Sequence, residues 1–248
     1  VELFISTYTF SQQIDTTTYF QLSEIEVIGN ISPSIVREAT PLQVMDRVDI
    51  ERLGVQNLSE VVKHFSGVTV KDYGGIGGLK TVSVRSLGAQ HTAVSYDGVT
   101  ITDAQSGQVD ISRFSLDNVE MVSLSIGQTD DIFQTARMCA SAGALSIKSL
   151  RPDFLTKPFR LNAQVKTGSF GMVNPYILYE QKLGKKWGAS LNGDYLRADG
   201  NYPFTLTNVS QVENLKRHNS DIESWRTELN LWGDLGRGGN LSVKGYYF

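Results

Sequence analysis

The chain has 248 residues, and 23 Lys and Arg side chains stand against 26 Asp and Glu, a formal net charge of -3. This balance argues against a nucleic-acid partner, for which a basic stripe would be expected. No run approaches the roughly 20 apolar residues of a membrane-spanning helix, although transmembrane strands alternate and leave only a weak hydropathy signal. The one cysteine, Cys139, excludes an intramolecular disulfide framework and a cysteine-based zinc site. Its small-residue surroundings, ARMCASAGAL, predict a buried, inert thiol.

Residues 1–21 have the features of a signal-peptide remnant followed by a flexible N-terminus. VELFISTYTFSQQ starts apolar and closes with a small-x-small pattern, Thr9-Phe10-Ser11, before a polar residue. This pattern predicts export from the cytoplasm, and a disordered chain end is the alternative.

Residues 40–150 mix helix and strand signals, which predicts a compact α+β domain. Asn57 is placed to cap a helix over LSEVVKHF, with Glu60 completing a capping box. The helix has one apolar face and a polar side that carries a solvated His64, and Gly67 supplies the stop. The apolar face consists of Leu58, Val61, Val62 and Phe65.

Strands are predicted next, over GVTVKDY, KTVSVRSL, HTAVSYDGVTI, VEMVSLSIG and ALSIKSL, with a turn at Asp97-Gly98. Ser86, His91 and Asp97 have the residue types of a catalytic triad, but nothing places the serine on a nucleophile elbow. The glycines at 74–78 are not a phosphate loop, because no Lys-Ser/Thr pair follows them. These segments therefore predict structure and loops, without catalysis.

From Phe159 the hydrophobic period becomes two. Apolar and polar residues alternate over 159–166, 187–195, 225–231 and 241–247. The connections are short at 169–172, 184–186 and 234–239 and long at 200–220. Long strands with one apolar face, tight turns on one side and a longer loop on the other predict transmembrane β-barrel strands. A soluble β-sandwich is the alternative, although its strands are usually shorter, about five to six residues.

The chain resembles the plug domain of TonB-dependent outer-membrane receptors, and most of all their cobalamin-transporter branch. The resemblance rests on LSEVVKHFSGVTV, VSVRSLGAQHTAVSYDGVTI, GQVDISRFSLDNVEMVSLSIG and SAGALSIKS and continues through GSFGMVNPYILYEQKLGKKWGASLNGDY. It implies an α+β plug domain at 40–150, followed by antiparallel transmembrane strands at the start of a plugged barrel of about 22 strands. Residues 158–248 would form the first five or so of these strands. Because a full barrel needs several hundred more residues, we expect the chain to be a fragment of a longer receptor that is incomplete at both ends, with the C-terminal cut at Phe248.

The resemblance also implies a function. The expected protein is not an enzyme but a receptor in the outer membrane of a Gram-negative bacterium, which binds a scarce chelate, cobalamin or a related corrinoid, and imports it with energy from the inner membrane. A ferric siderophore or haem receptor is the alternative within the family, and a secreted or surface-exposed adhesion protein the alternative outside it. The implied partners are the TonB C-terminal domain, the chelate, outer-membrane lipid and a surface lipoprotein, with no nucleic acid and no required cofactor.

Three segments match functional parts of the family. By position, residues 22–29 are the candidate Ton box, whose alternating apolar residues suit β-augmentation onto a partner sheet; an edge strand of the plug is the alternative. The expected Ton-box residues are Leu22, Ser23, Glu24, Ile25, Glu26, Val27 and Ile28. The expected substrate-binding loops comprise Tyr73, Gly74, Gly75, Ile76, Gly77 and Gly78, and Ala104, Gln105, Ser106, Gly107 and Gln108. Their glycines let the backbone approach a ligand closely.

The family pattern is broken at two places. Arg85-Ser86 stands where relatives carry Arg-Gly, and Ser125-Ile126-Gly127-Gln128 stands where they show Arg-Gly-Pro. The missing arginine would pair with carboxylates on the inner barrel wall, so we expect the plug to be seated differently. Some receptors of the family bind calcium through acidic barrel loops. Asp194, Asp199 and Asp221 flank the long loop here and are the expected ligands, with solvated carboxylates as the alternative.

Overall fold

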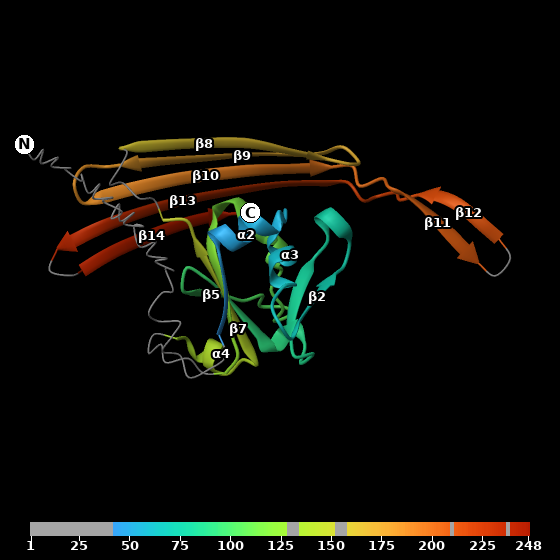
Figure 1. The fold of residues 1–248 in the computed structure, drawn as a ribbon, viewed down its shortest axis with the longest axis horizontal. Helices are drawn as coiled ribbons and strands as arrows, with labels where there is room; N and C mark the ends of the chain where they lie inside the picture. Colours follow the sequence, from blue (N-terminus) through green and yellow to red (C-terminus); the bar gives the residue numbers. More distant parts are fainter. Residues whose placement is uncertain (1–41, 128–133, 152–157, 209–210, 237–238) are drawn as a thin grey trace, which may run out of the picture. The chain divides into compact units, whose positions relative to one another are not determined.

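The computed structural model describes residues 42–127, 134–151, 158–208, 211–236 and 239–248. The predicted signal-peptide remnant at 1–21 and the candidate Ton box at 22–28 lie outside these residues. The described part contains an α+β domain, residues 42–149, and a sheet of long strands, residues 159–247, which we call the wall sheet (Figure 1).

The α+β domain is built on one mixed sheet with the strand order β1-β6-β7-β4-β5. Its strands are β1 (Leu42–Asp46), β4 (Thr92–Tyr96), β5 (Val99–Ile101), β6 (Val119–Ser125) and β7 (Gly143–Ser149). Strands β2 (Val68–Asp72) and β3 (Lys80–Val84) form a separate antiparallel hairpin. The helices are α2 (Arg47–Leu53), α3 (Leu58–Val62) and α4 (Ala136–Cys139), and 3-10 turns occupy Gly75–Gly77, Ala89–His91, Ile111–Arg113 and Leu116–Asn118. No helix among the described residues is long and apolar enough to cross a membrane.

The predicted helix forms, but it is shorter than the apolar pattern indicates. The Asn57 side chain accepts a hydrogen bond from the Glu60 amide at 3.1 Å, while the Glu60 carboxylate accepts one from the Gln56 amide at 2.9 Å, one residue before the expected partner. The α-helix ends at Val62 and is followed by tighter turns, yet Phe65 stays buried and His64 is exposed as predicted. The four apolar residues of this face are all at most 4% exposed, so the core prediction is confirmed.

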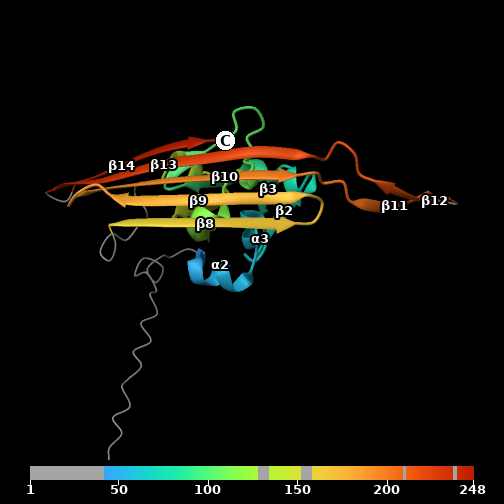
Figure 2. The same ribbon diagram turned by 90° about the horizontal axis from the view of Figure 1, so that it is seen from above.

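The wall sheet is antiparallel, with the order β14-β13-β10-β9-β8 (Figure 2). Its strands are β8 (Phe159–Gly168), β9 (Met172–Lys182), β10 (Trp187–Ala198), β13 (Ile222–Gly236) and β14 (Gly239–Tyr247). The expectation of one long loop at 200–220 is wrong in part, because this segment contains a hairpin of β11 (Pro203–Asn208) and β12 (Gln211–Lys216). Backbone pairing within the hairpin satisfies the polar groups that an extended loop would leave to water.

The burial of side chains on the two faces of the wall sheet is the reverse of that in a soluble β-sandwich. Large apolar side chains on one face are exposed, among them Leu161 at 61%, Trp225 at 59% and Leu229 at 54%. Polar side chains on the other face are buried, including Asn174, Glu180, Ser190, Asn192, Asp194, Glu228 and Asn230. An apolar face turned outward and a polar face turned inward is the arrangement of transmembrane barrel strands, and it argues against a β-sandwich.

The cysteine prediction is wrong. Cys139 is exposed at the end of α4, and its thiol donates a hydrogen bond to the Gln134 side-chain oxygen at 3.3 Å. The small residues around it do not form a core cluster there, because this four-residue helix presents its last turn to solvent.

Candidate functional site

The polar face of the wall sheet contacts the α+β domain through a buried carboxylate, Glu228 of β13, which is 3% exposed. The carboxylate accepts hydrogen bonds from the Tyr96 hydroxyl at 2.6 Å and from the Asn118 amide at 3.1 Å, both in the α+β domain. Within the wall sheet, Asn230 donates to it at 2.8 Å and the Lys244 ammonium lies at 2.7 Å. A carboxylate buried this deeply is tolerated because each oxygen is hydrogen-bonded and a cation is paired with it.

Lys244 of β14 joins this carboxylate to the α+β domain. Its ammonium forms an ion pair with Asp97, lies 3.2 Å from the Ser149 hydroxyl, and stands 3.9 Å from the centroid of the Tyr96 ring. Asp97 is held in place by the Ser149 amide, which donates to it at 2.8 Å. Asp97 and Gly98 both adopt positive φ, as the predicted turn requires. One cation thus pairs with a carboxylate on each side of the interface, and we call Tyr96, Asp97, Asn118, Ser149, Glu228 and Lys244 the interface cluster.

Tyr96 acts as a permanent donor in the interface cluster. Burial, together with the neighbouring negative charge of Glu228, raises the pKa of Tyr96 far above that of an exposed phenol. The hydroxyl therefore remains protonated at any physiological pH and stays available as a donor to Glu228. Its ring also packs against Phe114, with the ring centroids 5.1 Å apart.

Two further contacts made by cations of the wall sheet cross the same interface. Lys166 of β8 pairs with Asp117 at 2.7 Å, and both side chains are at most 22% exposed. Arg226 of β13 pairs with Asp194 of β10 and also donates to the Ser112 backbone oxygen at 3.1 Å. In each case the wall sheet supplies the cation and the α+β domain supplies the acceptor.

The first predicted ligand loop lies against the segment that leads from β12 into β13. Ile222 packs so closely on Gly77 that a Cβ atom there would come within 2.5 Å of the Ile222 Cδ1 atom. The Arg217 guanidinium lies 3.8 Å from the corresponding Cβ position at Gly74 and donates to the Tyr202 hydroxyl at 2.6 Å. Tyr73 is 57% exposed beside them. The loop therefore adjoins a cation and aromatic side chains.

Asp72 fixes the base of this loop. Its Oδ1 atom accepts from the Gly74 and Gly75 amides at 3.0 and 2.9 Å, and its Oδ2 atom from the Lys80 ammonium at 2.7 Å. Partial burial raises the pKa of Asp72, but the hydrogen bonds from Lys80 and the two amides outweigh it and hold the pKa below its ordinary value.

The second predicted ligand loop is shaped by Asp103, and its neighbours are in the α+β domain. Backbone hydrogen bonds from Ser106, then its hydroxyl, and the Gln105 amide lower the pKa of Asp103. The Arg137 guanidinium donates to the Gly107 backbone oxygen at 3.0 Å, and Gly107 has a positive φ of 68°. These contacts define the conformation of the loop; its role in binding a ligand stays a prediction.

The aspartates expected to bind calcium are not gathered into a site. Asp194 is 5% exposed in the wall sheet and its carboxylate is committed to Arg226, whereas Asp199 and Asp221 are exposed near the ends of β10 and β13. In the part of the chain that the structure describes, no group of three or more His, Cys, Asp and Glu side chains could hold a metal ion. The calcium expectation therefore finds no geometric support.

The interface cluster was missed by sequence reasoning. Glu228 and Asn230 alternate with apolar residues of β13 and therefore lie on the opposite, inward face of the strand. This alternation was a usable signal for a buried polar contact. Their partners could not be found in the same way, because Tyr96 and Asn118 lie 132 and 110 residues away in sequence.

Comparison with known proteins finds one family model that matches part of the chain, mostly in the α+β domain. Residues 34–136 match the family model of the TonB-dependent Receptor Plug Domain. The chain is also similar in fold to the copper transporter OprC, with a TM-score of 0.60 and 12% identity over 82% of this chain and 29% of that one. It is also similar to the pyoverdine outer membrane receptor FpvA of Pseudomonas aeruginosa PAO1, with a TM-score of 0.60 and 15% identity over 83% of this chain and 27% of that one.

A mutant of the ferric enterobactin receptor PfeA of Pseudomonas aeruginosa gives a TM-score of 0.58 and 14% identity over 83% of this chain and 32% of that one. The chain therefore spans about a third or less of the length of these structures. At such low identities the similarity establishes a shared fold: an α+β plug domain followed by antiparallel barrel strands.

Proposed function

We propose that this chain is the plug and first wall strands of an energy-coupled outer-membrane receptor for a metal chelate. The proposal starts from the match of residues 34–136 to the TonB-dependent receptor plug domain family. The observation that carries the proposal is the inverted wall sheet: its apolar face is exposed and its polar face holds the plug domain through Glu228 and Lys244. Such a receptor binds its cargo and moves it without changing its covalent structure, so we propose no enzymatic activity.

The ligand that best suits the described residues is an anionic ferric siderophore. Arg217 and the Tyr202 ring, whose centroid lies 5.4 Å from the guanidinium carbon, adjoin the loop at Gly74–Gly78. A guanidinium and exposed aromatic faces favour a negatively charged chelate that carries aromatic or carbonyl oxygen groups. Similar structures include receptors whose names specify pyoverdine and ferric enterobactin. A corrinoid offers less negative charge to Arg217 and is the second candidate.

A binding experiment separates these ligands. The protein in detergent micelles is titrated with ferric catecholate and hydroxamate siderophores and with cyanocobalamin, and the quenching of its aromatic fluorescence is measured. We expect saturable binding of an anionic ferric siderophore, weakened about tenfold by Arg217→Gln, the usual effect of losing a charged hydrogen bond. The matched control is Lys216→Gln, which removes an exposed neighbouring charge. Tighter binding of cyanocobalamin, insensitive to Arg217→Gln, would favour the corrinoid instead.

Energy coupling is proposed to act through residues 22–28. The alternating Ile25 and Val27 suit strand addition to the TonB C-terminal domain, and proline at either position would remove a ladder hydrogen bond. We expect the purified TonB C-terminal domain to bind the protein, and Ile25→Pro to abolish this binding while siderophore titration is unchanged. Equal TonB binding by the proline variant would contradict the Ton-box role.

The adhesion alternative differs in where the protein partitions. A receptor wall with an exposed apolar face requires detergent or lipid, whereas a secreted binding protein remains in the aqueous phase. Fractionation of the expressing cells, followed by extraction with and without detergent, tests the outer-membrane location directly. Recovery in the soluble fraction would overturn the proposal.

A further inference from the structure

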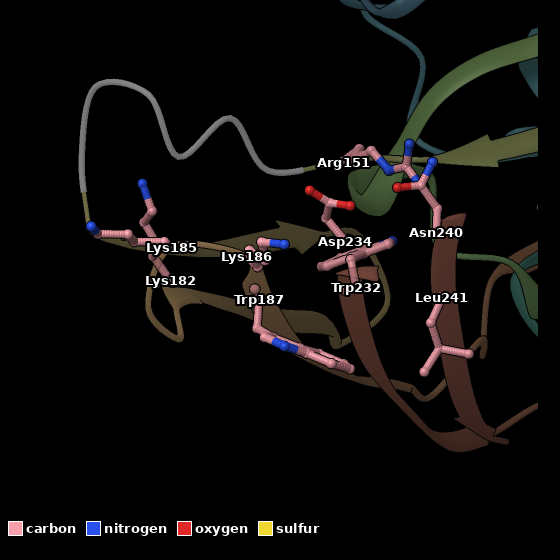
Figure 3. Close-up of a pocket in the computed structure, with 11 residues that line it drawn as sticks. Arg151, Lys182, Lys185, Lys186, Trp187, Trp232, Asp234, Asn240 and Leu241 are labelled. Atoms are coloured by element: carbon pink, nitrogen blue, oxygen red, sulfur yellow. The ribbon is translucent and has the colours of Figure 1, made fainter. Parts of the chain in front are cut away.

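A hollow of about 310 Å³ lies where the connection between β9 and β10 meets the end of β13 and the start of β14. Four cationic side chains line it, Arg151, Lys182, Lys185 and Lys186, against one carboxylate, Asp234. Figure 3 shows Lys182 and Lys185 at one end of the hollow and Arg151, Asp234 and Asn240 at the other. A volume near 300 Å³ is at the lower end of what small-ligand sites occupy.

Three cations of this hollow, Arg151, Lys185 and Lys186, have no ion-pair partner among the described residues. Across the interface, the cations Lys244, Lys166 and Arg226 each pair with a carboxylate. Arg151, Lys185 and Lys186, by contrast, make no ion pair with any residue that the structure describes. Asp234 is partly committed, since its Oδ1 atom accepts from the Gly236 amide at 2.7 Å. The remaining positive charge favours an anion from outside the chain.

The hollow also lies at the depth where lipid headgroups are expected. Trp187 is the first residue of β10, and its ring covers Gly233 so closely that a Cβ atom there would lie 2.5 Å from the indole. Trp232 of β13 lines the same hollow from the polar face, on which Glu228 and Asn230 also lie. A tryptophan at the end of a membrane strand on its apolar face, as Trp187 is, marks the headgroup level of the bilayer. Cations at this level meet the phosphate groups of the adjoining leaflet.

We propose that this hollow, the rim site, binds the phosphate of an anionic phospholipid from the leaflet on the short-turn side of the wall sheet. A guanidinium donates two parallel hydrogen bonds to a pair of phosphate oxygens, and the lysines add point charges. Arg151 follows the last strand of the plug domain, whereas Lys185 and Lys186 belong to the wall, so a bound phosphate links the two. The inference rests on the proposed membrane location of the wall sheet.

Tryptophan fluorescence tests the rim site, because the chain has three tryptophans and two of them line it. The protein carrying Trp225→Phe is mixed in micelles with brominated phosphatidylglycerol or brominated phosphatidylcholine, and quenching of Trp187 and Trp232 is measured. We expect half-maximal quenching at a several-fold lower fraction of phosphatidylglycerol. The triple variant Arg151→Gln, Lys185→Gln, Lys186→Gln should lose this preference, because each cation near an anionic surface contributes about fivefold to binding.

The matched control removes three exposed cations elsewhere, Lys63→Gln, Lys71→Gln and Lys216→Gln, and should keep the preference. Loss of the preference in the control, or its retention in the triple variant, would overturn the rim site. Millimolar inorganic phosphate distinguishes the source of the anion: displacement of the lipid would identify a site for soluble phosphate and contradict the lipid proposal, whereas no displacement supports it.

A parallel measurement separates failure of the rim site from failure of the membrane location. With Trp187→Phe and Trp232→Phe, the remaining fluorescence comes from Trp225, which is 59% exposed on the apolar face. Quenching of Trp225 by brominated phosphatidylcholine without any preference at the rim site would refute the rim site alone. Absence of Trp225 quenching would refute the membrane location of the wall, and the rim site with it.

Discussion

Replacing Lys244 by methionine keeps the length of the side chain and removes a cation that contacts both Glu228 and Asp97. Breaking a fully buried ion pair by removing one partner costs about 3–5 kcal/mol. The Lys244 side chain is 21% exposed and that of Glu228 is 4% exposed, so solvent screens part of the lost attraction. Because Glu228 keeps its hydrogen bonds from Tyr96, Asn118 and Asn230, we expect the plug domain to loosen from the wall by about 2–3 kcal/mol.

Hydrogen exchange of the β4 amides reports this loosening, because Tyr96 and Asp97 lie at the contacted end of that strand. Exchange is compared between wild type, Lys244→Met, Glu228→Gln and the double variant, all in the same micelles. The charge pair predicts a coupling of about 1–3 kcal/mol, so Lys244→Met should cost much less when Glu228 is already neutral. An exposed lysine of β12, changed by Lys216→Met, is the control for the loss of one positive charge.

Two outcomes would refute this reasoning. If Lys244→Met changes the free energy of opening by no more than Lys216→Met does, the ion pair makes no contribution to seating. If the effect of Lys244→Met is the same with Glu228 and with glutamine at that position, the lysine acts through Asp97 or through packing instead.

Three further predictions concern the plug domain. Because the pKa of Asp72 is lowered in the folded protein, the carboxylate stabilises the fold at pH values above its ordinary pKa of 3.8, and this stabilisation is lost as the pH falls through the lower pKa of the folded state. The difference in unfolding midpoint between wild type and Asp72→Asn should therefore shrink below about pH 4. Gly77→Ala should force Ile222 aside, destabilise the loop by about 1–3 kcal/mol, and recover in the double variant with Ile222→Ala, as measured by thermal unfolding. Lys166→Met should lower the free energy of opening at the amides of Asp117 and its neighbours by about 1 kcal/mol, measured by hydrogen exchange. An unchanged exchange rate would show that this pair is only a surface contact.

The wall sheet could be predicted from sequence because a strand alternates its side chains between two faces. Phe159, Leu161 and Val165 stand on one face at 61–66% exposure, and the pattern of period two identifies them without any knowledge of the partner strands. The hairpin of β11 and β12 was not predicted, because the alternation of Tyr202, Phe204 and Leu206 is short and is followed by a mostly polar stretch. Helix α2 was also missed: Asp46 caps it, and its side chain accepts from the Asp49 amide, but it buries only Ile50 and leaves almost no periodic signal.

The partners across the interface could not be predicted, because they are far apart in sequence and no local pattern joins them. The chain has Ser125-Ile126-Gly127-Gln128 where the family resemblance implies an arginine, and this departure predicts a different seating of the plug. In the structure the carboxylates of the interface are still paired, but Lys244, Lys166 and Arg226 of the wall supply the positive charge.

The location of these cations on the wall sheet, and not on the plug domain, affects how the plug domain could be released. A cation carried by the plug would leave together with the plug and expose a bare carboxylate on the wall. Here Lys244 and Arg226 belong to the wall, so Glu228 and Asp194 keep a paired cation within the same sheet if the plug domain moves. The unpaired buried charge left on the wall is therefore smaller. Separation mainly breaks the hydrogen bonds that Tyr96 and Asn118 donate to Glu228. It also breaks the ion pairs of Asp97 and Asp117, whose carboxylates then return to water. Wall-borne cations therefore make the plug domain easier to displace than plug-borne ones would.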